Sequence, residues 1–130
     1  MLWTPLTSSD ATAFNERFLY FGDATVRRLV LTWIPDACTI YVDAMDSSDN
    51  NKWVQVQLHC VDVLAFSWNS EWSGSVQCEE LFVTFVDDAI YVAVALEHDK
   101  FQVASDFTDD KVDMMIKSRS VSFAIAEISD

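Results

Sequence analysis

From Val26 onward, short apolar runs with a period of two dominate the chain. In residues 38–45, Cys38, Ile40, Val42 and Ala44 alternate with other residues, and residues 53–60 repeat the alternation. A period of two is the repeat of a β-strand, whose successive side chains point to opposite faces of a sheet. The segment 46–51 between the two runs is rich in Asp, Ser and Asn, which favour turns. The two runs are therefore predicted to form a β-hairpin.

Short apolar runs of the same kind continue to the end of the chain. The predicted strands cover residues 26–33, 38–45, 53–60, 61–68, 81–86, 90–96, 101–107, 112–117 and a last run from 121 to 128, with a bulge or corner near 61–62. The connections are too short for crossover helices, which excludes a parallel sheet. We expect a mainly β fold of about eight strands, an antiparallel sandwich or a strongly curved meander. The 130 residues contain no linker or repeat, so one domain over 1–130 is expected.

One short helix is predicted before the strands, in residues 9–21. Three phenylalanines at positions 14, 18 and 21 fall on one face of a helix there. Ser8 or Ser9 is suited to cap the N-terminus, because a hydroxyl can accept a hydrogen bond from an unpaired backbone N–H. Gly22 is expected to end the helix as the residue that follows its last turn.

The chain is strongly acidic, with 21 Asp and Glu against 8 Lys and Arg and a formal net charge of −13. Residues 66–130 hold 13 of the acids and four of the bases. This charge argues against binding of nucleic acid, which needs clustered Lys and Arg, and it favours encounter with a basic partner. The first ten residues lack the pattern of a signal peptide, and no window reaches about 18 apolar residues. We expect a cytoplasmic protein without a membrane partner.

No set of side chains in the sequence predicts a catalytic, metal or cofactor site. The three cysteines are widely spaced and form no CxxC pair, so buried, reduced thiols are expected. His59 and Cys60 are neighbours on one strand and point to opposite faces, so they do not suit a shared metal ion. An enzyme is not expected. The alternative is a small β-fold hydrolase that uses Glu79, Glu80 or a Cys–His pair.

A binding surface is predicted instead, from the acids of the second half and two tryptophans. Trp68 and Trp72 bracket a short polar loop, and tryptophan is enriched at interface hot spots, although core packing is the alternative for both. The acids stand at predicted turns, which form one surface only if the hairpins bring them to a shared end or face. The predicted partner-binding residues are Trp68, Trp72, Glu79, Glu80, Asp87, Asp88, Glu97, Asp99, Asp106, Asp109, Asp110 and Asp113.

The segment 21–26, Phe-Gly-Asp-Ala-Thr-Val, resembles the F-[HG]-D-A-x-[IV] opening of immunity-protein family 50. In that family a hairpin follows, then a strand similar to residues 56–63 (VQLHCVDV), and a C-terminal strand similar to residues 116–123 (IKSRSVSF). The similarity spans residues 18–128 in the same order. The chain departs from the pattern at Gly22, where His is common, and at Cys60, where an aromatic residue is usual.

The resemblance implies a protein that neutralises a cognate bacterial toxin by occlusion, without catalysis. Many such toxins are nucleases with basic clefts, so a basic protein toxin is the partner that agrees with the acidic charge. The other class left open is a structural subunit that forms a homo-oligomer, which a large exposed apolar patch would indicate.

Overall fold

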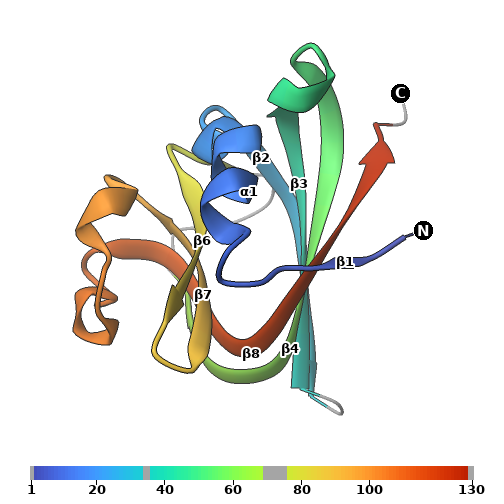
Figure 1. Ribbon diagram of the computed structural model, residues 1–130. Coiled ribbons are helices and arrows are strands. Elements are labelled where there is room, and N and C mark those ends of the chain that lie inside the picture. The colour runs from blue at the N-terminus through green and yellow to red at the C-terminus, as the bar shows by residue number, and fades with distance from the viewer. Residues whose placement is uncertain (1, 34–35, 69–75, 129–130) are drawn as a thin grey trace.

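The computed structural model describes residues 2–33, 36–68 and 76–128. Eight of its segments are strands of one antiparallel sheet, in the order β5-β2-β3-β4-β8-β7-β6, with β1 paired to β8 (Figure 1). The strands are β1 (Thr4–Pro5), β2 (Thr25–Trp33), β3 (Asp36–Asp46), β4 (Lys52–Trp68), β5 (Val76–Gln77), β6 (Leu81–Val86), β7 (Ala89–Ala95) and β8 (Val112–Glu127). The prediction of a mainly β, antiparallel fold is confirmed, and the strands belong to one curved sheet rather than to two stacked ones.

A sharp bend in β4 and β8 divides the sheet into two wings (Figure 1). Asp62 has a left-handed backbone with φ 57°, and the pairing of β4 with β8 changes register between Val63 and Ala65. The expected corner near 61–62 is therefore present. It bends one long strand, however, so residues 53–60 and 61–68 are not separate strands. Residues 112–117 and 121–128 are likewise joined, because β8 continues through the same bend.

The concave side of the sheet is filled by the helix α1 (Ala11–Arg17), the 3-10 turn η1 (Leu19–Phe21) and the apolar face of the strands (Figure 1). Phe14, Phe18 and Phe21 are buried there, with neighbouring ring centroids 5.2–5.9 Å apart. This confirms the predicted phenylalanine stripe. Burial of side chains of this size contributes roughly 1.5–3 kcal/mol each, so α1 is stabilised mainly by its packing.

Both ends of the helix differ from the prediction. The residue at the N-cap is Asp10, without a side-chain capping bond, in place of Ser8 or Ser9. The helix ends at Arg17, and residues 19–21 follow with φ between 52° and 56°, while Gly22 is extended at φ −59° and ψ 133°. The turn at residues 19–21 places Phe18 and Phe21 in the core, so the helix ends before Gly22.

The segment 101–107, predicted as a strand, instead forms a cover over the convex face of β6 and β7. It continues from the 3-10 turn η3 (His98–Lys100) and contains η4 (Ala104–Asp106). The carboxylate of Asp106 accepts hydrogen bonds from the backbone N–H groups of Gln102 and Val103, at 2.8 and 2.9 Å. These bonds close a compact turn, which the alternation of apolar residues did not reveal.

Two polar contacts join α1 to the sheet. Asn15 is buried, and its side-chain amide donates to the carbonyl of Val83 and accepts from the N–H of the same residue, both at 2.9 Å. Arg17 forms an ion pair with Asp46 at the end of β3. The amide of Asn15 thus pairs with β6, the last strand of the sheet, as a neighbouring strand would. Within the described residues, no helix has both the length and the apolar character needed to cross a membrane.

Candidate functional acidic end

Seven of the predicted acids lie at one end of the wing formed by β6, β7 and β8. Leu81 pairs with Val94, and Ala95 pairs with Val112, so the start of β6, the end of β7 and the start of β8 lie side by side. The residues flanking these positions share that end of the sheet. We call them the acidic end: Glu79, Glu80, Glu97, Asp99, Asp109, Asp110 and Asp113.

Side chains of the acidic end hold the loops there in place. The Glu80 carboxylate accepts hydrogen bonds from the backbone N–H of His98, at 3.0 Å, and lies 2.8 Å from Nδ1 of the same residue. Asp109 accepts from the hydroxyl of Ser67 at 2.8 Å, and Asp110 accepts from the hydroxyl of Thr108. That hydroxyl bond lowers the pKa of Asp110 below its ordinary value, so the group is ionised at neutral pH.

The negative charge of the acidic end is only partly neutralised. Lys100 forms an exposed ion pair with Glu97 at 2.6 Å, and Lys111 follows Asp110 in the chain. The acidic end thus contains seven acids, and the same loops contain two lysines. Glu79, Glu97, Asp99 and Asp113 are exposed, so their charges reach solvent and a partner. The arrangement suits a surface that attracts cations.

Three of the predicted acids are not members of this group. Asp87 and Asp88 form the turn at the opposite end of β6 and β7, which six residues of strand place roughly 20 Å away. There they line the same hollow as Lys117 and Arg119, which offset their charge. Asp106 belongs to the cover, where its carboxylate binds backbone N–H groups that also lower its pKa.

The two predicted tryptophans have different outcomes. Trp68, near the end of β4, is 38% exposed, and its ring stacks on Phe66 with centroids 6.1 Å apart. Trp72 lies outside the described residues.

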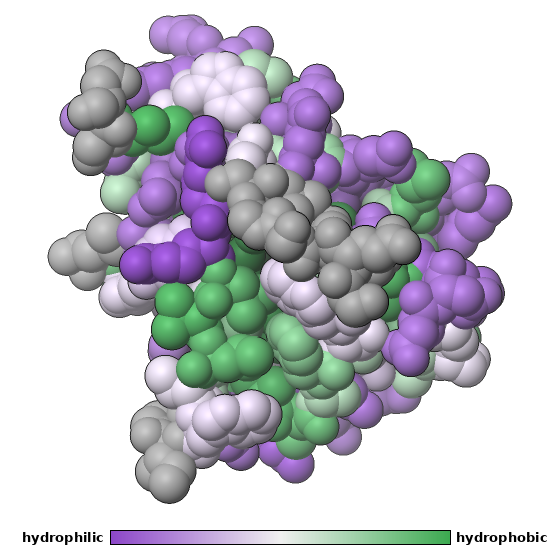
Figure 2. Space-filling view, turned by 180° about the vertical axis from the view of Figure 1, so that it is seen from behind, coloured by the Kyte–Doolittle hydropathy of each residue, from purple (hydrophilic) through white to green (hydrophobic). Residues whose placement is uncertain are grey.

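Figure 2 shows that apolar surface gathers on the back of the molecule. Large apolar side chains that are exposed in β2 and β4 are Val30, Trp33, Trp53, Leu64, Phe66 and Trp68.

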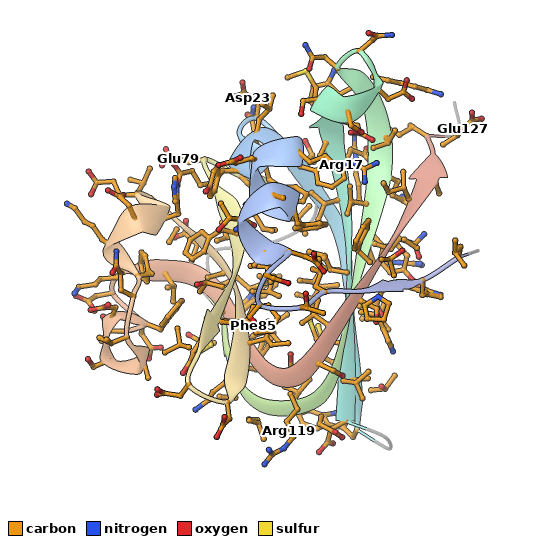
Figure 3. All side chains as sticks on the ribbon, in the orientation of Figure 1. Arg17, Asp23, Glu79, Phe85, Arg119 and Glu127 are labelled. Atoms are coloured by element: carbon orange, nitrogen blue, oxygen red, sulfur yellow. The ribbon has the colours of Figure 1, made fainter. Side chains whose placement is uncertain are left out.

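Two further acids near the acidic end were not selected from the sequence. The N–H of Cys78 donates to the carbonyl of Ala24 at 2.7 Å, which brings Asp23 and Glu79 to the same end of the molecule (Figure 3). Partial burial raises the pKa of the Tyr20 phenol, and the charge of Glu16, on α1, raises it further. Both acids lie in the first half of the chain, and each has arginine residues nearby in the sequence, so no local excess of negative charge pointed to them.

The cysteines provide no activated thiol. Cys38 and Cys60 are opposite each other on β3 and β4, and Cys78 is also buried. Burial raises the pKa of Cys38 and of Cys78 to about 12, and it also raises the pKa of Cys60. His59 points to the other face of the sheet, where its Nδ1 lies 2.8 Å from the hydroxyl of Thr39. Among the described residues, no three His, Cys, Asp or Glu side chains are grouped as metal ligands.

A polar hollow of about 350 Å³ lies between α1 and β6, next to the acidic end. Its walls include the side chains of Thr12, Tyr20, Thr84 and His98. This hollow could not be predicted from the sequence, because its residues come from four separate segments.

Comparison of the chain with protein-family models, with curated proteins and with solved structures found no match. The resemblance to immunity-protein family 50 therefore stays a prediction.

Proposed function

We propose that this protein is a binding protein of the immunity type, which neutralises a basic bacterial toxin by occluding it with the acidic end. The observation that carries the proposal is the convergence of seven acids on one end of the β6–β7–β8 wing, with two lysines among them. Residues 79–80, 97–99 and 109–113 are distant in sequence, and the strand pairing brings them together. The protein itself performs no chemistry in this account.

Long-range electrostatics supplies the mechanism. A surface with excess negative charge raises the rate of encounter with a positively charged cleft. Once docked, carboxylates occupy positions that the phosphates of a nucleic-acid substrate would take, so the substrate is excluded. A net charge of −13 on the whole chain adds to the same attraction.

Three described carboxylates are held in the ionised form, as a surface that binds by its negative charge requires. Asp46, Asp106 and Asp110 all have pKa values below the ordinary one, so these carboxylates are ionised at neutral pH. A carboxylic acid that donates a proton in catalysis needs the opposite shift. The raised thiol pKa values likewise keep the cysteines protonated and poorly nucleophilic.

Protection of cells tests the proposal. The toxin candidate is the protein encoded beside this chain in its native host or recovered with it by affinity capture, and it is co-expressed with three forms of the chain. The wild type and the remote double variant Asp36→Lys/Asp88→Lys are expected to protect. Asp109→Lys/Asp110→Lys makes the same change of charge at the acidic end and is expected to protect less. Absence of protection by the wild type would overturn the proposal.

A further inference from the structure

The hollow between α1 and β6 has an unusual wall, formed by two stacked rings. The phenol ring of Tyr20 lies on the imidazole of His98, with centroids 3.7 Å apart and an angle of 16° between the planes. The ring of Phe82 is tilted against the same imidazole, with ring centroids 6.2 Å apart. Tyr20, His98 and Phe82 therefore form an aromatic part of the wall of the hollow.

Backbone and side-chain contacts fix both rings in place. Tyr20 is the middle of three consecutive residues with left-handed backbones, at φ 55°, 52° and 56°. This conformation is costly for residues other than glycine, and it is maintained only by the surrounding packing. His98 is bound by the Glu80 carboxylate through its backbone N–H and its ring Nδ1. The wall of the hollow is thus preorganised before any ligand arrives.

The rest of the hollow offers hydrogen-bond acceptors. The hydroxyl-bearing residues Ser8, Thr12 and Thr84 line it from two sides, and Asn15 lies between them. The polar atoms of the Asn15 amide already bind Val83, so the hydroxyls are the groups that can turn towards a ligand. None of the ten lining residues is an Asp, Glu, Lys or Arg.

Two carboxylates lie close to the hollow, because Glu80 is 2.8 Å from Nδ1 of His98 and Glu16 acts on the phenol of Tyr20. The pKa of Tyr20 is raised above its ordinary value, first by partial burial and then by the charges of Glu16 and Glu80. The phenol is therefore neutral at physiological pH. The negative charges of Glu16 and Glu80 are felt at the position of the Tyr20 ring. A cation is stabilised by such charges and by the face of an aromatic ring.

We infer that this hollow binds the guanidinium group of an arginine side chain. A guanidinium is flat and delocalised, so it can lie against the stacked rings of Tyr20 and His98 while its N–H groups donate to the threonine and serine hydroxyls. The compact, strongly hydrated ammonium of lysine matches this wall less well. The inference deepens the proposed function and rests on it for the source of the arginine, which is the basic partner docked on the acidic end.

A matched pair of small probes tests the site without the partner. Nα-acetyl-L-arginine amide and its uncharged isostere Nα-acetyl-L-citrulline amide are titrated into the ¹⁵N-labelled protein at pH 8, above the ordinary histidine range. With the arginine probe, saturable amide shifts are expected at Thr12, Thr84 and His98, with a dissociation constant on the order of millimolar. The citrulline probe is expected to cause none. Equal shifts with both probes, or no saturable shift at these residues, would overturn the inference.

Two variants identify the groups involved. Tyr20→Leu removes the ring and is expected to weaken binding of the arginine probe about three- to fivefold. Thr84→Val is isosteric, preserves the strand and removes one acceptor, with a loss of about threefold or more expected. Thr25→Val, the same substitution on β2, should leave the affinity unchanged. Unchanged binding in both Tyr20→Leu and Thr84→Val would contradict the assignment.

The two experiments distinguish a failure of the proposed function from a failure of the guanidinium site. If the arginine probe binds but the chain protects against no toxin, the proposed function is wrong and the guanidinium site stands. If the chain protects through the acidic end but the probe does not bind, only the guanidinium site is wrong.

Discussion

Arg17 and Asp46 form a two-point ion pair that fastens α1 to the end of β3. The distances are 3.0 Å from Nε to Oδ1 and 2.8 Å from the terminal nitrogen to Oδ2. The Asp46 carboxylate also accepts from the N–H and the hydroxyl of Ser48, and Ser47 donates its hydroxyl to the carbonyl of Arg17. The side chain of Asp46 is only 4% exposed. This pair therefore joins the helix to the hairpin connection between β3 and β4.

Removal of the Arg17 charge should destabilise the fold. Arg17→Met retains most of the apolar stem and leaves the Asp46 carboxylate buried without its counter-charge. The expected loss of unfolding free energy is about 2 kcal/mol, less than for a fully buried pair because Arg17 is one-third exposed. Urea denaturation measures it. Lys52→Met removes a charge from the exposed Lys52–Glu127 pair and should cost no more than about 0.5 kcal/mol. Equal losses would contradict this account.

The same pair makes stability depend on pH in the acid range. The hydrogen bonds from Arg17 lower the pKa of Asp46 to about 2, below the ordinary value of about 3.9. Because the folded state holds the lower pKa, the stabilisation is present above about pH 4 and is lost as the pH falls towards 2. The difference in unfolding free energy between wild type and Asp46→Asn should therefore shrink by about 2 kcal/mol between pH 6 and pH 2. A difference that stays constant over this range would refute the assignment.

Asn15 should be required for the integrity of β6. Asn15→Ala leaves the N–H and the carbonyl of Val83 without the partners they have in the native fold. Buried polar groups left in that state cost about 1–3 kcal/mol, and the amide of Val83 should exchange with solvent faster. Hydrogen exchange followed by NMR measures this. Thr12→Ala, an exposed position on the same helix, is the control, and it should leave the exchange rate of Val83 unchanged.

The cysteines should be inert in the native state. Cys38, Cys60 and Cys78 are at most 2% exposed, and burial raises the pKa of each thiol. An alkylating reagent at pH 8 should modify none of them within the time in which it modifies all three in denaturant. Mass spectrometry counts the modified thiols. Rapid native modification of any one of them would show that a thiol is accessible and that the Cys–His alternative needs to be reconsidered.

The sequence predicted the features that repeat locally. Alternating apolar residues identified most strands, and the phenylalanine spacing identified the buried face of α1. The same pattern misassigned residues 101–107. Phe101 and Phe107 are buried against Phe82 and Tyr91 by a cover, and the backbone N–H groups of this cover donate hydrogen bonds to the Asp106 carboxylate. The pattern also divided β4 and β8, since a bend within a strand resembles a boundary between two strands.

The candidate site shows what the sequence could not provide. The acids at 79–80, 97–99 and 109–113 were selected from charge alone, but their separation from Asp87 and Asp88 depends on which end of the β6–β7 hairpin each turn occupies. Because β8 pairs with β7, the turn at residues 109–113 lies beside residues 79–80 and 97–99. The Tyr20–His98 wall depends on a left-handed backbone at Tyr20, which no local residue preference predicts.

The rate at which the toxin associates with this protein at different salt concentrations tests the central claim most directly. Binding of the captured toxin to wild type, Asp109→Lys/Asp110→Lys and Asp36→Lys/Asp88→Lys is followed by stopped flow. The Debye length shortens from about 30 Å at 0.01 M salt to about 8 Å at 0.15 M. The acidic-end variant should associate several-fold more slowly than the remote variant at low salt, and the gap should narrow at high salt. Equal slowing by both variants would show that only net charge matters and would contradict a docking role for the acidic end.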